Sequence, residues 1–226
     1  ATNIRELKAI YAGTLKKFDR FDFQANIRRD VLDGYRLNSS TNEYQKNTYL
    51  FGLGYRLTNN YRLTATTSTG FRAPAPYEFV STPSLKPEKN KSNEVGIAYI
   101  SQTANLRMIY FNTQASDAIY YHPTDYVYQN MNVQNKGIEM SGKKIFGLTS
   151  IKASFTKQNP INTDINLQQA RRAKEFGSLD LNHQLGQYLI GGLLYWSGSR
   201  KDSDFSQTVL PSYTAVSYTH LTLPTK

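Results

Sequence analysis

Residues 50–57 read Leu-Phe-Gly-Leu-Gly-Tyr-Arg-Leu, in which a wholly apolar set of positions alternates with a mixed set. The apolar set is Phe51, Leu53, Tyr55 and Leu57, and the mixed set is Leu50, Gly52, Gly54 and Arg56. Successive side chains of a β-strand point to opposite faces, whereas a helix repeats about every 3.6 residues. This stretch therefore predicts a strand with one apolar face and one more polar face.

The same alternation recurs along the chain and indicates about eleven strands. We expect strands at residues 4–16, 21–32, 47–57, 61–71, 91–100, 105–117, 126–142, 149–158, 170–184 and 187–198, and the start of another at 208–216. Short turns are expected near residues 19–20, 59–60, 102–104, 146–148 and 186–187. Longer polar connections cover residues 33–45, 72–90, 159–169 and 199–208, with a tighter one at 119–128. Short and long connections thus alternate.

An alternation of short and long connections is typical of outer-membrane barrels, which have short periplasmic turns and longer external loops. The expected strands also suit the roughly 9–11 residues that a tilted strand needs to cross a bilayer. We therefore predict an all-β fold, an antiparallel transmembrane β-barrel. An odd number of strands departs from the even number that bacterial single-chain barrels use. We interpret the chain as a partial barrel, with about 11 of about 22 strands.

The composition argues against several other classes of protein. The 226 residues include no cysteine, which excludes disulfides and cysteine-based zinc sites or nucleophiles. The net charge of +10 could indicate an anionic partner, but Lys and Arg are scattered, so we expect no nucleic acid. No Gly-x-Ser-x-Gly, His-Glu-x-x-His or phosphate-binding glycine loop occurs. We predict no catalytic residue, no metal site and no cofactor.

The most distinctive motifs lie in residues 69–94. Residues 69–74 read Thr-Gly-Phe-Arg-Ala-Pro, residues 83–89 read Pro-Ser-Leu-Lys-Pro-Glu-Lys, and Asn93-Glu94 follow. They resemble a stretch of TonB-dependent outer-membrane receptors, although Ser84 stands where that family usually has Asn. A second match is Gly-Ile-Glu at residues 137–139. The residues that carry the resemblance are Gly70, Phe71, Arg72, Ala73, Pro74, Leu85, Lys86, Pro87, Glu88, Glu94, Gly137, Ile138 and Glu139.

Two further segments resemble the vitamin B12 (cobalamin) receptors within this family. They are Arg-Arg-Asp at residues 28–30 and Ala-Arg-Arg-Ala-Lys at residues 170–174, which leads into Gly-Ser-Leu-Asp-Leu at 177–181. Siderophore receptors also have arginine-rich strand starts here. The resemblance therefore implies cobalamin as cargo, with a ferric siderophore or haem as the alternative. A passive outer-membrane porin is an alternative of another class, which should lack the two motifs of residues 69–94.

The resemblance also implies a mechanism and a location. A TonB-dependent receptor takes up its ligand actively across the outer membrane of a Gram-negative bacterium. The ligand binds the outer loops and a plug domain in the lumen, and TonB then displaces the plug from the periplasmic side. We expect residues 1–215 to be the C-terminal half of such a barrel, with TonB engaged through a plug that this sequence does not contain. Expected partners are cobalamin or another metal chelate, outer-membrane lipid and lipopolysaccharide.

The final segment departs from the family pattern. Residues 216–226 read Val-Ser-Tyr-Thr-His-Leu-Thr-Leu-Pro-Thr-Lys and resemble a translated sequencing adapter. We expect this tail to be non-native, and the alternative is a frayed natural terminus.

Aromatic side chains gather at the expected outer ends of strands. The candidates for ligand contact are Tyr77, Phe79, Tyr126 and Tyr128. Their rings could stack on a flat ligand such as a corrin. The alternative interpretation is the aromatic girdle that marks the membrane interface of any such barrel.

Overall fold

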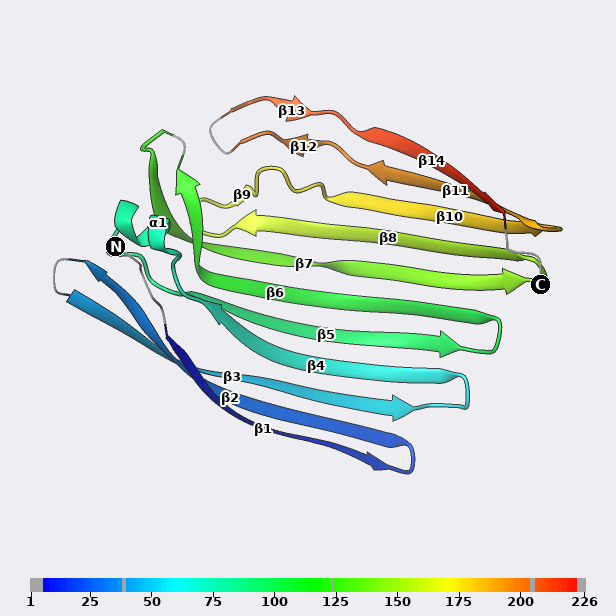
Figure 1. The fold of residues 1–226 in the computed structure, drawn as a ribbon, viewed down its shortest axis with the longest axis horizontal. Helices are drawn as coiled ribbons and strands as arrows, with labels where there is room; N and C mark the ends of the chain where they lie inside the picture. Colours follow the sequence, from blue (N-terminus) through cyan, green and yellow to red (C-terminus); the bar gives the residue numbers. More distant parts are fainter. Residues whose placement is uncertain (1–5, 38–39, 123, 204–205, 223–226) are drawn as a thin grey trace.

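The computed structural model describes residues 6–37, 40–122, 124–203 and 206–222. These residues form one large curved antiparallel sheet, a separate two-stranded sheet and one short helix (Figure 1). The elements are β1 (Leu7–Phe18), β2 (Phe21–Leu37), β3 (Ser40–Arg56), β4 (Tyr61–Arg72), α1 (Pro76–Ser81), β5 (Glu88–Ile100), β6 (Ala104–His122), β7 (Val127–Phe146), β8 (Thr149–Asn162), β9 (Leu167–Gln168), β10 (Glu175–Leu185), β11 (Tyr188–Ser197), β12 (Arg200–Lys201), β13 (Val209–Leu210) and β14 (Tyr213–Thr222). Within the described residues, no helix has the length and apolarity needed to cross a membrane.

The strands lie side by side in chain order. The sheet runs β1-β2-β3-β4-β5-β6-β7-β8-β10-β11-β14, while β9 pairs with β8 and β12 pairs separately with β13. Short turns gather at one end of the sheet, and α1 and the longer connections gather at the other (Figure 1). Three short turns contain a residue of positive φ, namely Asp19 at 45°, Gly147 at 54° and Gly186 at 60°. Tight reversals between strands commonly need this conformation. The predicted antiparallel sheet of about eleven strands, with alternating connection lengths, is confirmed.

Side chains divide between two chemically different faces of the sheet. Leu53, Ala65 and Val95 are register partners across β3, β4 and β5, so they share one face. On the opposite face, Thr66 is paired with Glu94. The apolar face leaves large side chains open in the isolated chain, among them Phe23, Leu53, Val95, Met108, Met140, Leu179 and Leu194. Such a face suits contact with lipid acyl chains.

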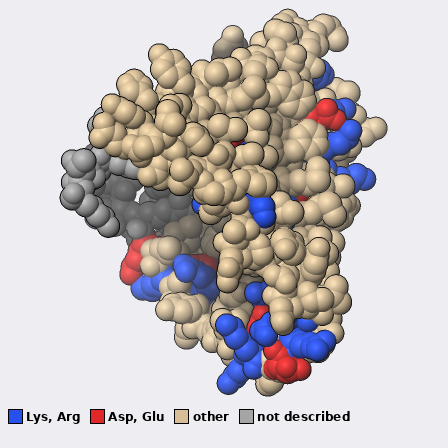
Figure 2. All heavy atoms as spheres, turned by 90° about the vertical axis from the view of Figure 1, so that its right-hand side faces the viewer, with Lys and Arg blue, Asp and Glu red and all other residues tan. Residues whose placement is uncertain are grey.

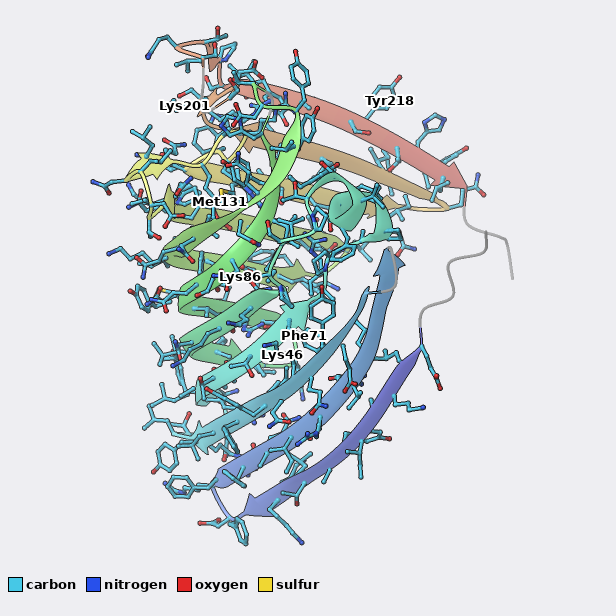
Figure 3. All side chains as sticks on the ribbon, turned by 90° about the vertical axis from the view of Figure 1, so that its left-hand side faces the viewer. Lys46, Phe71, Lys86, Met131, Lys201 and Tyr218 are labelled. Carbon is cyan, nitrogen blue, oxygen red and sulfur yellow. The ribbon has the colours of Figure 1, made fainter. Side chains whose placement is uncertain are left out.

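The polar face is the concave one. Helix α1 lies on that side of the sheet, at the end with the longer connections (Figure 3). Seen from the short-turn end, charged side chains occupy mainly the lower part and the right edge of the surface (Figure 2). We call the end that carries α1 the outer end and the concave face the lumen face.

Several expected boundaries are wrong at the outer end. The expected connection at residues 33–45 includes residues 38–39, which lie outside the described residues, and the rest of it continues β2 and β3, whose pairing extends to Leu37 and Ser40. Strands β6 and β8 also run further, to His122 and Asn162. Backbone pairing between strands does not require that apolar and polar residues alternate, and the alternation ends before the pairing does. The sequence signal therefore stops before the strands do.

The expected strand at residues 170–184 begins too early. Strand β10 starts at Glu175, because Arg171 has a φ of 58° in a turn that precedes it. The expected connection at residues 72–90 contains the unpredicted helix α1. At the other extreme of the chain, β14 pairs with β11 from Tyr213 to Thr222 and so includes residues of the expected tail. The non-native origin of residues 216–226 stays a prediction.

Candidate ligand-binding mouth

Arg72 organises the outer end of the lumen face. It ends β4 and lies opposite Glu88, the first residue of β5, in the pairing of these strands. Its Nη1 donates to both carboxylate oxygens of Glu78 on α1, at 3.0 Å each. Its Nε lies 3.5 Å from Oε2 of Glu88. One guanidinium therefore joins two strands and the helix.

Glu78 also begins the helix. The backbone N–H of Ala75, the N-cap residue, donates to Oε2 of Glu78 at 2.6 Å. Pro76 occupies the first turn, where a missing backbone donor is harmless. The Glu78 side chain is only 6% exposed, so its charge depends on these partners. Helix α1 is thus fixed by polar contacts on one carboxylate.

Asn130 of β7 holds the segment that follows the helix. Its Oδ1 accepts the backbone N–H of Lys86 at 2.9 Å, and its Nδ2 donates to the carbonyl oxygen of Lys86 at 3.0 Å. The same amide group donates to the carbonyl of Asp117 at 2.7 Å. Asp117 has a φ of 57° and lies in a bulge of β6. Asn130 therefore ties the Leu-Lys-Pro-Glu segment to this bulge.

A second asparagine, Asn132, fixes the next outer turn. Its backbone N–H and Nδ2 donate to the carboxylate of Asp164 at 2.7 and 2.8 Å. These hydrogen bonds favour the charged carboxylate and lower the pKa of Asp164. The carbonyl of Asn132 also accepts the backbone N–H of Thr163 at 2.8 Å. The turn at residues 163–166 is thereby attached to β7.

Three tyrosines from α1, β6 and β7 form a cluster at the mouth. The ring centroids of Tyr77 and Tyr128 are 5.7 Å apart in an edge-to-face arrangement, and those of Tyr121 and Tyr128 are 5.2 Å apart. Tyr77 remains 63% exposed. Its ring is therefore both held by a neighbour and open to a ligand.

The other two candidates for ligand contact lie elsewhere. Tyr126 is exposed in the turn between β6 and β7. Phe79 is buried, so its ring packs within the protein and is closed to a ligand in this structure. Of the four residues expected to contact ligand, the structure brings together Tyr77 and Tyr128.

The family-motif residues have distinct structural positions. Ala73, Pro74 and Leu85 are buried beside α1. Glu94 lies on the lumen face and accepts a hydrogen bond from Ser92 at 3.4 Å. Gly137, also on the lumen side, leaves no room for a side chain. The remaining motif positions are Gly70 and Phe71 near the end of β4, Pro87 before β5, and Ile138 and Glu139 in β7.

Sequence reasoning missed Asn130, Asn132 and Asp164. No local pattern marks them, because their partners are backbone groups or side chains up to 44 residues away. Helix α1 does have a signal, namely Pro76 followed two residues later by Glu78. Within the described part of the chain, no group of three or more His, Asp or Glu is arranged to hold a metal ion.

The fold and this mouth define a class of protein, the antiparallel outer-membrane barrels with long outer connections. More specifically, the model of the TonB dependent receptor-like beta-barrel family matches residues 2–223, and the chain belongs to this family. It is thus part of an outer-membrane barrel from a family of non-enzymatic receptors.

Curated relatives and solved structures agree with this assignment. The vitamin B12 transporter BtuB of Photobacterium profundum is 22% identical over 96% of this chain and 36% of its own length. The BtuB of Vibrio vulnificus is 27% identical over 70% of this chain and 27% of its own. The chain therefore spans about a third of these relatives.

Among solved structures, the copper transporter OprC has a TM-score of 0.83 at 14% identity, covering 96% of this chain and 38% of its own. The FrpB iron transporter from Neisseria meningitidis has a TM-score of 0.77 at 16% identity, with the same coverage. The TM-scores establish a shared fold, and at identities this low the likeness shows the fold alone. They support the interpretation of the chain as part of a larger barrel.

Proposed function

We propose that the full-length receptor containing this chain takes up cobalamin by TonB-dependent transport. The observation that carries the proposal is the likeness to two vitamin B12 transporters, one of which aligns with 96% of the chain. The exposed Tyr77 ring, held edge-to-face by Tyr128, supplies a surface suited to a flat macrocycle. TonB would act through a plug domain supplied by the rest of the receptor.

The Arg72 network supports this assignment of the ligand contact. It fixes α1 by three contacts of Glu78, and α1 carries Tyr77. A ring on a fixed helix loses less conformational freedom when it binds a ligand. In this proposal the motif residues position the helix, and the tyrosines contact the cargo.

A ferric siderophore is the second candidate. The structural likeness to the FrpB iron transporter and to the ferripyoverdine receptor of Pseudomonas aeruginosa, with a TM-score of 0.80 at 16% identity, is compatible with such cargo. The observation in its favour is the exposed pair Arg171 and Arg172 before β10, since guanidinium groups suit an anionic chelate.

The experiment is a binding comparison on the purified full-length receptor with cyanocobalamin, a ferric siderophore and haemin. We expect tight binding of cyanocobalamin and about fivefold weaker binding in Tyr77→Ala, the loss of one aromatic contact. The matched control is Tyr99→Ala, because Tyr99 pairs with Tyr61 at 5.0 Å near the short-turn end. Binding of the siderophore but not of cyanocobalamin would reverse the choice of cargo.

A further inference from the structure

A groove of about 650 Å³ lies on the apolar face of the sheet, near the short-turn end. Its lining includes Leu106, Met108, Met140, Gly142, Ala153 and Phe155. These residues come from β6, β7 and β8, whose pairing places all six on the face opposite Glu139. We call this feature the inner groove. It lies on the surface that contacts lipid in an outer-membrane barrel.

Two small residues create the inner groove. Gly142 and Ala153 are direct register partners near the short-turn ends of β7 and β8. Larger side chains flank them, and the lack of a side chain at Gly142 lets Leu106 pack against the backbone of β7, because a Cβ there would lie 2.5 Å from Leu106 Cδ2. A pair of small residues between long ones leaves a trough in an otherwise even apolar surface.

Lys144 provides a charge at the end of this trough. It lies two residues beyond Gly142 on β7, so its side chain is on the same face. Its Nζ donates to Thr103 Oγ1 at 3.0 Å and lies 5.5 Å from the centre of the Phe146 ring. Both partners are neutral, and among the described residues no carboxylate lies within ion-pair distance of Lys144. The ammonium group therefore has no anionic partner from the described part of the protein.

The position of Lys144 matches that of a lipid headgroup. The lysine precedes the short turn at residues 147–148, at the edge of the apolar face. Lysine side chains at such an edge lie along apolar surface and place the ammonium among headgroups. The nearest anionic groups in that layer are the phosphates of phospholipids. An apolar trough that ends in a lysine thus complements a phospholipid in both shape and charge.

We propose that the inner groove holds one glycerophospholipid of the inner leaflet, with an acyl chain along Gly142 and Ala153 and its phosphate on Lys144. A net-anionic headgroup is preferred, because a zwitterionic one brings its own ammonium group to compete for the phosphate. The proposal rests on the membrane-barrel family and on the orientation of the sheet. It does not depend on which cargo the receptor carries.

The test uses the full-length receptor in phosphatidylglycerol or phosphatidylethanolamine, with retained lipid counted by native mass spectrometry after washing in detergent. The decisive variant is Lys144→Gln. Its matched control is Lys143→Gln, because Lys143 pairs with Lys152 on the lumen face. Ala153→Phe, which fills the trough with apolar volume, tests the acyl-chain contact independently. Heat-modifiable electrophoretic mobility reports whether each variant has folded.

We expect one phosphatidylglycerol to remain on the unmodified receptor and about fivefold less on Lys144→Gln, the effect of one lysine near a charged surface. Lys143→Gln should retain lipid as the unmodified receptor does, and Ala153→Phe should lose it. Equal retention by Lys144→Gln, or an equal loss in Lys143→Gln, would overturn the proposal. Equal retention of both lipids, with loss in Lys144→Gln, would overturn only the preference for an anionic headgroup.

Discussion

Removing Arg72 should release helix α1 while the barrel stays intact. In Arg72→Ala, the Glu78 carboxylate keeps its buried position, at 6% exposure, but loses two hydrogen bonds of 3.0 Å. Breaking a fully buried ion pair costs about 3–5 kcal/mol. Arg72 is 43% exposed, so water already screens part of the interaction, and we expect about 2 kcal/mol.

The assay is hydrogen exchange of amides that are protected only when α1 is formed. The amide of Phe79 donates to Ala75 O at 3.0 Å, and that of Thr82 donates to Glu78 O at 2.9 Å. A loss of about 2 kcal/mol in local stability raises the exchange of both amides about 30-fold. Arg62→Ala is the matched control, since Arg62 forms an ion pair with Asp22 at 2.6 Å near the opposite end of the sheet. It should leave these amides unchanged.

A second substitution separates the charge from the packing. Glu78→Gln keeps an oxygen that can accept the Ala75 N–H and leaves Arg72 beside Glu88, so it should accelerate exchange less than Arg72→Ala does. In the double variant, the side chain at position 78 is neutral and no unpaired charge is buried. Most of the protection should therefore return. Exchange in the double variant as fast as in Arg72→Ala would refute this account.

Two other predictions concern backbone space and pH. Gly137→Ala should lower the free energy of unfolding in urea by about 2 kcal/mol, because its Cβ would lie 2.8 Å from Gln158 Cα and even closer to Lys157 O. Gly192→Ala, which has open space around the added Cβ, should change it by under about 0.5 kcal/mol, and similar values for both would contradict this steric argument. The pKa of Asp164 is lowered in the folded chain, so the charged carboxylate stabilises the fold at pH values above its ordinary pKa of 3.8. This stabilisation is lost as the pH falls through the lower pKa of the folded state. Protection of the Thr163 amide against hydrogen exchange, corrected for intrinsic exchange, should fall in that acidic range. In Asp164→Asn the protection should depend less on pH. Unchanged protection in the unmodified chain would count against the Asn132 contacts.

The membrane-facing part of the fold could be predicted because lipid-facing and lumen-facing side chains alternate along each of its strands. On β3, Phe51 and Leu53 must face lipid while Gly52 and Gly54 face the lumen, and this requirement produces a period of two. Short turns could be located for the same reason, since each ends one run of alternation. Of the eleven strands on the main path of the sheet, the sequence therefore predicted all but β14 near their observed positions at the short-turn end.

The outer end could not be predicted in this way. Residues 33–45 were expected to form a connection, yet the pairing of β2 and β3 extends to Leu37 and Ser40. At residues 170–174 the alternation favoured a strand, but the positive φ of Arg171 and a turn displaced its start to Glu175. Local patterns do not encode contacts such as that between Asn130 and Lys86, which join segments far apart in the sequence.

At the outer end, the motif residues and the residues proposed to contact ligand occupy different positions. Arg72, Glu88 and Lys86 belong to the recognisable motifs, and the structure uses them to fix α1 and its following segment. Tyr77 lies between the two motifs, on the helix that they fix, and its ring is exposed. In this chain the motif residues hold the helix through polar contacts, while the ring of Tyr77 stays open at the mouth. Structures with 14–16% identity share this fold while their names refer to copper or iron, so the fold alone does not identify the cargo, and the Tyr77→Ala binding comparison tests the proposed contact directly.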